Sequence, residues 1–362
     1  MNILILTTHL NPGGISRYVL NLAKGLKNRG SNVWVANCGG EWVLKLKELG
    51  IGYKFIYINT KSIVSFKILI SFFMLLSLVL NKKIQLIHAN TRVTQFLGFL
   101  IYKFLKIPYV STFHGFYRAS FFRRHFKFCG LRTIAISKAV KEHLIRDLKI
   151  KEENIRVIYN GTDIEDFLIK KRSKEDFGFS QKDFIIGILG RISQEKGHFL
   201  AVEAFSLLVK EYKNIFLLIN GRGKLERKLK LFIESLGLTD RVKFIQHLES
   251  REFLDILDLL IVASKKEGFG FTIIEAFIKN VAVIGYNTGG IREIIKDREN
   301  GLLFYEYNSL SLKRAIEELI LDKALYEKIV EKAKLNVDYF SLERMVNETL
   351  LVYNEILGKI KK

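Results

Sequence analysis

Two carboxylates eight positions apart, Glu267 and Glu275, mark the stretch of this chain that is best suited to chemistry. A buried-strand pattern at 259–263 precedes them, and the Gly-aromatic-Gly turn at 268–270 leads into an apolar helical pattern. Backbone N–H groups at such a turn favour anions, and glycine lets a ligand come close to the chain. Carboxylates bind anions poorly but accept hydrogen bonds from sugar hydroxyls. The pattern therefore predicts a sugar nucleotide, with its phosphates on the amides and its hydroxyls on the glutamates.

A second candidate site is the Gly-Arg-x4-Lys-Gly loop at 190–197, which follows a strand expected at 184–189. A guanidinium from Arg191 and an ammonium from Lys196 that converge on one spot would suit a diphosphate. They would stabilise the negative charge that grows on a departing nucleoside diphosphate. The alternative is ordinary solvated charge.

The N-terminal half offers two weaker candidates at the carboxyl ends of expected strands. Gly13 and Gly14 form a turn before a helix that carries Arg17, and such a turn would let the backbone approach a phosphate. A tight structural turn with a surface arginine is an equal alternative. No G-x-G-x-x-G is present, so a dinucleotide site is not supported. His114 ends the strand expected at 109–113, where it would bind a sugar hydroxyl or assist proton movement, unless it is a structural histidine.

Composition fits a chain of 362 residues that forms two α/β domains, with 49% hydrophobic residues and only two prolines. Two cysteines without CxxC spacing argue against a disulfide framework or a zinc site and favour a reducing cytoplasm. The N-terminus runs directly into a strand pattern, so we expect no secretory signal. The apolar segment Ile68–Leu80 is shorter than the ~20 residues that span a bilayer. It is either a buried or half-buried helix or one that dips into a membrane.

Positive charge is concentrated in residues 1–150, which hold 23 Lys/Arg and 4 Asp/Glu, a net charge of +19 of the chain's +21. This asymmetry favours an anionic partner for the first half. Basic and aromatic residues are interleaved at 116–128, which suits a membrane headgroup boundary but also stacking on nucleic-acid bases. A basic surface with no specific partner is the remaining alternative.

Alternating strand and helix patterns predict an α/β fold made of two doubly wound, Rossmann-like domains that face a central cleft. A charged stretch at 170–176 separates the two series of strands, so we expect an N-terminal domain at 1–170 and a nucleotide-sugar domain at 171–340. The segment 341–362 reads as a helix that would pack back on the first domain. The expected strands are 2–7, 32–37, 53–58, 86–90, 109–113, 133–137, 155–159, 184–189, 215–220, 242–246, 259–263, 281–285 and 302–304.

The order of these motifs resembles that of the GT-B glycosyltransferases of retaining family 4, also called glycosyl transferases group 1, over essentially the whole chain. The matching motifs in the second half are Gly-Arg-x4-Lys-Gly, Glu-Gly-Phe-Gly-x4-Glu-Ala, Gly-Gly-x2-Glu-Ile and Gly-Leu-Leu-Phe. The resemblance implies a catalytic set and a donor-binding set that overlap. The catalytic set is His114, Arg191, Lys196 and Glu267; the donor-binding set is Gly13, Gly14, Arg191, Lys196, Glu267, Gly268, Phe269, Gly270 and Glu275.

The resemblance also implies transfer with retained configuration, from a nucleotide sugar to a glycan or lipid-linked acceptor at the cytoplasmic membrane face. A UDP-sugar is preferred over a GDP- or ADP-sugar, with no further cofactor, and cell-envelope glycans such as lipopolysaccharide or capsule are the expected products. Asp-x-Asp is absent from the sequence, so we expect no metal-bound diphosphate. No pair of carboxylates is nominated for double displacement, which favours a front-face mechanism in which the leaving diphosphate helps take the acceptor proton.

Some positions depart from the family pattern and put the loop shape near the base and sugar in doubt. These positions are Lys224, Gln246, Ala263 and Asn280. A nucleotide-sugar epimerase or a phosphorylase on the same architecture is an alternative. A basic nucleic-acid-binding protein is another, but it leaves the segment 267–275 unexplained.

Overall fold

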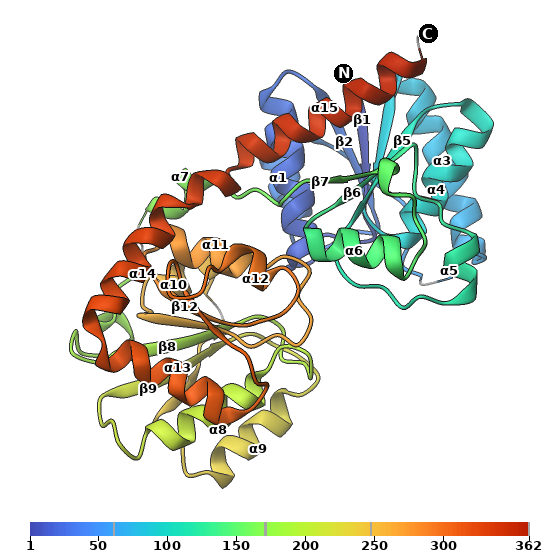
Figure 1. Ribbon diagram of the computed structural model, residues 1–362. Helices are drawn as coiled ribbons and strands as arrows, with labels where there is room; N and C mark the ends of the chain where they lie inside the picture. The colour runs from blue at the N-terminus through green and yellow to red at the C-terminus, as the bar shows by residue number, and fades with distance from the viewer. Residues whose placement is uncertain (61, 170–171, 247, 361–362) are drawn as a thin grey trace. The chain divides into compact units, whose positions relative to one another are not determined.

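The computed structural model describes residues 1–60, 62–169, 172–246 and 248–360 and divides into two units (Figure 1). Unit 1 comprises Met1–Gly161 and Phe340–Lys362, and unit 2 comprises Thr162–Tyr339. The sequence places the domain boundary at 170/171, which lies outside the described residues. The change of unit occurs earlier in the chain, directly after Gly161.

Unit 1 is built on a parallel sheet whose inner strands Asn2–Leu6, Leu86–Ala89 and Tyr109–Phe113 are buried on both faces, as expected for a sheet covered by helices, whereas the edge strand Gly52–Phe55 is only partly buried. Its described strands are β1 (Asn2–Leu6), β2 (Asn32–Asn37), β3 (Gly52–Phe55), β4 (Leu86–Ala89), β5 (Tyr109–Phe113), β6 (Arg132–Ala135) and β7 (Ile155–Val157). The order across the sheet is β3-β2-β1-β4-β5-β6-β7. The order reverses between β1 and β4, and doubly wound folds bind ligands outside the carboxyl ends of the strands at such a reversal.

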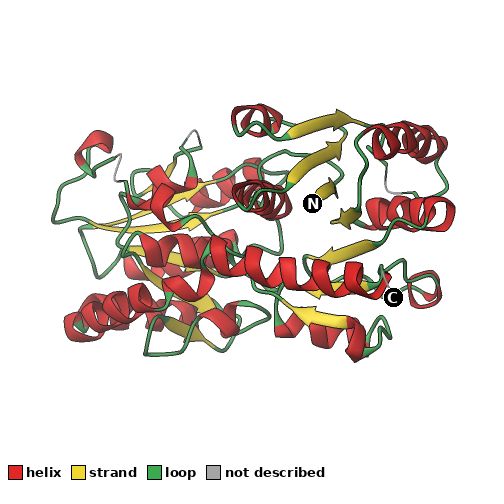
Figure 2. Ribbon diagram, turned by 90° about the horizontal axis from the view of Figure 1, so that it is seen from above, coloured by secondary structure: helices red, strands yellow, loops and turns green. Residues whose placement is uncertain are grey.

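Helices cover the strands on both sides, as Figure 2 shows. In unit 1 the described helices are α1 (Gly14–Asn28), α2 (Val43–Glu48), α3 (Phe66–Asn81), α4 (Arg92–Leu105), α5 (Phe121–His125), α6 (Lys138–Arg146), the 3-10 turn η1 (Glu152–Asn154) and α15 (Leu342–Ile360). Within the described ranges, none of the helices is both long and apolar enough to cross a membrane.

Helix α15 belongs to unit 1 although it comes last in the chain. It packs against α1, where a Cβ on Gly25 would lie 2.3 Å from Cγ2 of Val346, so the glycine allows close approach of the two helices. Tyr353 on α15 reaches the sheet and its hydroxyl lies 2.5 Å from Nδ1 of the buried His88. The C-terminal helix is therefore part of the core of unit 1.

Helix α3 contains the apolar segment Ile68–Leu80 and is buried on one face only. Phe72 and Leu75 lie in the core of unit 1, whereas Phe66 and Phe73 on the other face have 72% and 61% of their surface exposed. The helix is thus half-buried and presents an apolar face outward. Exposed apolar residues are common singly, and here several of them lie on one helix.

Unit 2 repeats the same architecture with a second parallel sheet, in the order β10-β9-β8-β11-β12-β13. Its described strands are β8 (Phe184–Leu189), β9 (Ile215–Asn220), β10 (Val242–Phe244), β11 (Leu259–Val262), β12 (Ala282–Tyr286) and β13 (Leu302–Phe304). Its described helices are α7 (Ile164–Leu168), η2 (Glu175–Phe177), α8 (His198–Leu208), α9 (Glu226–Ser235), α10 (Ser250–Leu254), α11 (Phe271–Ile278), α12 (Ile291–Ile294), α13 (Ser309–Leu321) and α14 (Lys323–Leu335), followed by η3 (Val337–Phe340). The predicted α/β class with two doubly wound sheets is confirmed, and every expected strand is present with its ends shifted by at most a few residues.

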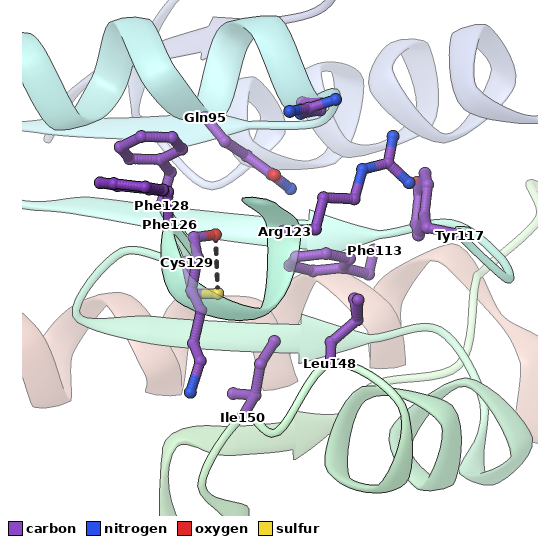
Figure 3. A pocket seen from close by; sticks show the side chains of 11 residues that line it. Gln95, Phe113, Tyr117, Arg123, Phe126, Phe128, Cys129, Leu148 and Ile150 are labelled. Atoms are coloured by element: carbon purple, nitrogen blue, oxygen red, sulfur yellow. Dashed lines mark hydrogen bonds between the residues drawn. The ribbon is translucent and has the colours of Figure 1, made fainter. Parts of the chain in front are cut away.

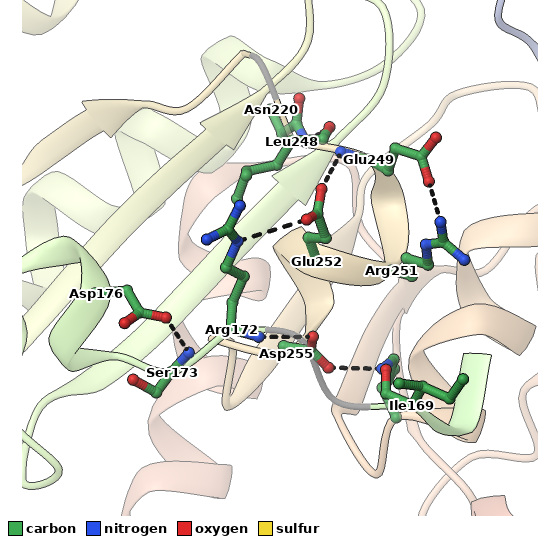
Figure 4. Close-up of polar contacts among 11 residues, drawn as sticks. Ile169, Arg172, Ser173, Asp176, Asn220, Leu248, Glu249, Arg251, Glu252 and Asp255 are labelled. Carbon is green, nitrogen blue, oxygen red and sulfur yellow. Dashed lines mark hydrogen bonds and ion pairs between the residues drawn. The ribbon is translucent and has the colours of Figure 1, made fainter. Parts of the chain in front are cut away.

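A buried ion pair fixes the start of unit 2 to its helices (Figure 4). Lys279, at the end of α11, lies 2.6 Å from Asp255, and the two side chains have only 6% and 2% of their surface exposed. Lys279 also donates to the carbonyl oxygen of Ile169, and Asp255 accepts from the backbone N–H of Arg172. The chain on either side of residues 170–171 is thereby attached to the helix that carries Glu275.

Candidate functional site

The loop after β8 carries Arg191 and Lys196 and packs against the loop after β9. A Cβ on Gly221 would lie 1.9 Å from the carbonyl oxygen of Gly190, and one on Gly223 would lie 2.1 Å from that of Ile192. The backbone N–H of Gly190 donates to Asn220, and that of Ile192 donates to Arg222. The Gly-x-Gly turn is therefore required because two stretches of backbone approach closely.

Lys196 and Glu267 are brought into direct contact. The Lys196 ammonium lies 2.5 Å from a carboxylate oxygen of Glu267, with 33% and 19% of the two side chains exposed. The loops that carry them are joined by a hydrogen bond from the N–H of Lys265 to the carbonyl oxygen of Glu195. Gly197 adopts a positive φ of 74°, and a Cβ there would lie 2.3 Å from the carbonyl oxygen of the residue after β11. Because β8 and β11 are neighbours in the sheet, the two loops meet at its carboxyl edge.

The turn between Glu267 and α11 is held in place by its own neighbours. The carbonyl oxygen of Glu267 accepts a hydrogen bond from Gly290, and a Cβ on Gly290 would lie 2.6 Å from the Cα of Phe269. Phe269 is buried, and Gly270 takes a positive φ of 115° as the N-cap of α11. The amides at 268–270 lie at the N-terminal end of this helix, where backbone N–H groups favour anions.

Glu275 lies on α11 with its side chain buried, whereas Arg191 is exposed on the β8 loop. Unit 2 thus contains a paired ammonium and carboxylate, an exposed guanidinium, a helix N-terminus and a buried carboxylate near one edge of one sheet. The sequence nominated each of these residues, but it assigned Lys196 to the diphosphate and Glu267 to the sugar without foreseeing that they pair.

Three of the four departures from the family pattern have a local geometry that the structure shows. Gln246 donates through Nε2 to the carbonyl oxygen of Gly221 at 2.9 Å, which steadies the β9 loop. Asn280 has a φ of 56°, a conformation that asparagine tolerates better than most residues, so it can stand where glycine is frequent. The carbonyl oxygen of Ala263 accepts a hydrogen bond from the hydroxyl of Tyr307.

In unit 1 the glycines lie at the start of α1, with Gly13 as the N-cap and Gly14 as the first helical residue. His114 follows β5 and is half-buried. Its Nε2 lies 2.9 Å from Oδ1 of Asn90, which follows the neighbouring strand β4. The ring of Tyr18 packs edge-on against the imidazole at 4.7 Å between centroids.

The hydrogen bonds of Asn90 determine which nitrogen of His114 carries the proton. The Nδ2 group of Asn90 faces the carbonyl oxygens of Leu6 and His88 at 3.3 and 3.5 Å, so Oδ1 faces His114 and accepts from its Nε2–H. Burial, together with the charge of His88, lowers the pKa of His114 to about 3. The imidazole is therefore neutral at physiological pH, with Nδ1 as a hydrogen-bond acceptor.

The sequence did not identify the buried polar network next to His114. His88 contacts the hydroxyl of Tyr353 through Nδ1 and that of Thr112 through Nε2, at 2.5 and 2.6 Å. Tyr18 is 3.2 Å from the same threonine hydroxyl, and burial lowers the pKa of His88 to about 3. Asn90 and His88 lie at the end of an apolar strand. This position at a strand end was the feature of the sequence from which they could have been nominated.

Two doubly wound parallel sheets are the architecture of GT-B glycosyltransferases, and solved structures of this fold superpose on the chain. Family models match both halves of the chain, "Glycosyl transferases group 1" over residues 169–336 and "Glycosyltransferase Family 4" over residues 12–166. The chain belongs to this glycosyltransferase family, as the motifs in its sequence predicted.

Known proteins that are similar to this chain include one relative in sequence and two solved structures. The capsular polysaccharide biosynthesis glycosyltransferase CapM of Staphylococcus aureus is 28% identical, over 64% of this chain and 63% of CapM. A solved glycosyltransferase from Rickettsia africae is 27% identical with a TM-score of 0.87, and 98% of each chain is covered. Anabaena HepE has a TM-score of 0.86 over 98% of this chain and 100% of its own, but at 22% identity this likeness shows the fold alone.

Proposed function

We propose that this protein is a retaining glycosyltransferase that moves a sugar from a nucleotide-sugar donor to a glycan or lipid-linked acceptor of the cell envelope. The observation that carries the proposal is the contact between Lys196 and Glu267 at the carboxyl edge of the unit 2 sheet. One side chain offers charge for a diphosphate and the other offers acceptors for sugar hydroxyls. Because the two side chains are in contact, they could bind the diphosphate and the sugar hydroxyls of the same donor molecule.

We propose a UDP-sugar as the donor, ahead of a GDP- or ADP-sugar, and no further cofactor. HepE, which has the same fold, was crystallised in complex with UDP and glucose. In unit 2 of this chain Arg191 and Lys196 would bind the diphosphate, with the amides at 268–270 close to it. The buried carboxylate of Glu275 would accept from the ribose hydroxyls.

We propose a front-face mechanism that needs no metal. The cations hold the leaving diphosphate, whose oxygen takes the acceptor proton while Glu267 holds the sugar hydroxyls. His114 is neutral, so its Nδ1 accepts a hydrogen bond from a sugar hydroxyl and does not act as a cation. Charge stabilisation at the diphosphate then falls to Arg191 and Lys196.

The test is transfer from radiolabelled UDP-sugars to envelope glycan acceptors by the wild type and by Lys196→Ala and Glu267→Ala variants. Each variant should lose at least ~10²-fold in transfer rate, the scale of one preorganised electrostatic contact. Lys328→Ala, which removes an exposed lysine of α14, is the matched control and should retain wild-type activity. Near-normal turnover in both site variants would refute the assignment, and isomerised donor formed without acceptor would indicate an epimerase.

We also propose that the enzyme works at the cytoplasmic face of the membrane and binds its anionic surface through unit 1. The support is the net charge of +19 in residues 1–150 and the exposed apolar face of α3, which is flanked by Lys67, Lys82 and Lys83. CapM, which is 28% identical, acts in capsular polysaccharide biosynthesis, a cell-envelope process. Apolar side chains flanked by lysines bind anionic bilayers by combining burial with charge attraction.

Sedimentation with vesicles tests the membrane proposal. The wild type should bind vesicles that contain phosphatidylglycerol and should bind neutral phosphatidylcholine vesicles weakly. Phe66→Ser together with Phe73→Ser should reduce binding, whereas Leu351→Ser, which alters a 69% exposed residue of α15, should leave it unchanged. Equal failure of the wild type to bind both kinds of vesicle would overturn the proposal.

A further inference from the structure

A further buried histidine of unit 1, His143, lies beside the segment that carries His114. It belongs to α6 and faces the interior, with 7% of its surface exposed. The mechanism proposed above does not use it. Both of its ring nitrogens nevertheless have hydrogen-bond partners, one in the loop after β5 and one at the end of α6.

These two partners fix the tautomer of His143. The backbone N–H of Tyr117, in the loop after β5, donates to Nε2 at 2.9 Å. A backbone N–H can only donate, so Nε2 must be an acceptor without a proton. The other nitrogen, Nδ1, lies 2.7 Å from a carboxylate oxygen of Asp147 and carries the proton that this oxygen accepts. The imidazole is therefore neutral and protonated on Nδ1.

Neighbouring groups hold the His143 ring in this orientation. Hydrogen bonds from Arg146 and from His143 lower the pKa of Asp147 to about 2, so the carboxylate remains an acceptor at physiological pH. The ring of Phe116 packs edge-on against the imidazole, with 5.5 Å between the ring centroids. Nε2 is therefore directed at the loop after β5.

Tyr117 connects this histidine to His114. The Tyr117 hydroxyl accepts a hydrogen bond from the backbone N–H of His114 at 3.3 Å. The Tyr117 ring lies edge-on to that of Phe113 at 5.6 Å, and its centre is 5.4 Å from the guanidinium of Arg123 (Figure 3). The turn from His114 to Tyr117 is thus held at both ends, by the Tyr117 side chain at its start and by His143 at its end.

The conformation of this loop depends on such contacts. Residues 114–120 form neither helix nor strand, so no ladder of backbone hydrogen bonds fixes them. A catalytic group that is misplaced by about 1 Å can lose ~10²-fold in rate. The acceptor at Nε2 of His143 therefore bears on the position of His114.

We propose that His143 is a positioning residue for the transfer reaction: it accepts from the Tyr117 N–H and so fixes the loop that presents His114. This inference rests on the proposed function, in which Nδ1 of His114 accepts from a sugar hydroxyl. His143 pairs with Asp147 as the histidine of a catalytic dyad would, but its Nε2 is occupied by the backbone and does not act as a base.

Transfer kinetics separate this role from simple packing. His143→Gln keeps an acceptor, Oε1, near the position of Nε2 and should retain most of the wild-type kcat. His143→Phe keeps a ring but has no acceptor, so it should lower kcat by ~10-fold or more, the range for leaving one N–H without its partner. The KM for the donor nucleotide should change less than kcat, because the proposed diphosphate contacts lie in unit 2. Glu142→Gln, at an exposed residue of the same helix, is the control and should match the wild type.

Magnetic resonance of protein labelled with ¹⁵N-histidine tests the geometry without any substrate. The chain has seven histidines, few enough to assign by single substitutions. His143 should show the tautomer protonated on Nδ1, and His114 the one protonated on Nε2. The His114 ring signals should shift in His143→Phe and stay close to those of the wild type in His143→Gln.

Failure of this inference differs from failure of the proposed function. A His143 signal of the Nε2-protonated tautomer, or His114 signals that do not change in folded His143→Phe, would overturn the positioning role whether or not the protein transfers sugar. Wild-type kcat in His143→Phe, or equal losses in the Gln and Phe variants, would overturn it as well. If the wild type transfers sugar from no nucleotide donor, the proposed function fails, and the resonance experiment still decides whether His143 holds the His114 loop.

Discussion

The assignment of His114 as a neutral acceptor can be tested by replacing Asn90 with aspartate, which has nearly the same shape. The new carboxylate would lie about 2.9 Å from Nε2 of His114, where Oδ1 of the amide now accepts. With an effective dielectric constant of ~20, a charge pair at this distance is worth ~6 kcal/mol, or a factor of ~10⁴ in the proton equilibrium. The pKa of His114, lowered by burial to about 3, would rise as far as ~7 in the variant.

This change should give transfer a pH dependence that the wild type does not have. In the wild type His114 stays neutral from pH 5.5 to 9, so it contributes no titration to the rate. In Asn90→Asp the ring is protonated on both nitrogens below pH ~7, Nδ1 no longer accepts a hydrogen bond, and kcat should fall as the pH is lowered through this value. The KM for the donor nucleotide should change less than kcat, because the diphosphate contacts lie elsewhere.

The assay is kcat and KM against pH for the wild type, Asn90→Asp and Asn90→Ala. The alanine variant removes the hydrogen bond without adding charge, so it should lose ~1–3 kcal/mol of stability and keep a flat profile between pH 5.5 and 9. Identical profiles for the aspartate and alanine variants would show that the protonation state of His114 does not matter. A profile that falls with rising pH in Asn90→Asp would refute the acceptor role directly.

Three further predictions concern stability and loop geometry. Asp255→Ala leaves the buried ammonium of Lys279 without its carboxylate and should cost ~3–5 kcal/mol in thermal or denaturant unfolding, whereas Asp166→Ala, at an exposed ion pair, should cost ~1 kcal/mol or less. Because burial lowers the pKa of His88 to about 3, the folded state binds fewer protons than the unfolded state between that value and the ordinary 6.5. The free energy of unfolding of unit 1 should therefore be highest above pH 6.5 and should fall as the pH drops below this value. Urea unfolding followed by the fluorescence of the two tryptophans, both of which lie in unit 1, checks this prediction. An unfolding midpoint that does not change between pH 7.5 and 5 would contradict it. Gly221→Ala places a Cβ 1.9 Å from a facing carbonyl oxygen and should weaken UDP binding by calorimetry, while unchanged affinity would show that the loop yields without cost.

The strands and the order of the motifs were predictable from the sequence because they depend on local pattern. Runs of Ile, Leu and Val between Gly-rich turns form strands wherever a parallel sheet is covered on both faces. Residues that follow such strands lie at the carboxyl edge of a sheet, which is why Lys196, Glu267 and His114 could be nominated. The position of a residue along its own strand is enough for this inference.

The partners of these residues were not predictable, because they come from strands that neighbour each other only in the folded sheet. Lys196 meets Glu267 since β8 lies beside β11, and His114 meets Asn90 since β5 lies beside β4. The ambiguity of the Ile68–Leu80 segment had the same origin, since an apolar stretch does not show which of its faces the core will cover.

The sequence by itself determined the class of fold, the family and the residue types at the site, since each follows from spacing and side-chain chemistry along the chain. Only the tertiary structure decided that the ammonium of Lys196 and the carboxylate of Glu267 form one contact and that an asparagine sets the tautomer of His114. Each of these contacts depends on the order of strands in the sheet and on packing between segments that are distant in the sequence. Burial and charge interactions contribute free energy only once the fold has brought those segments together.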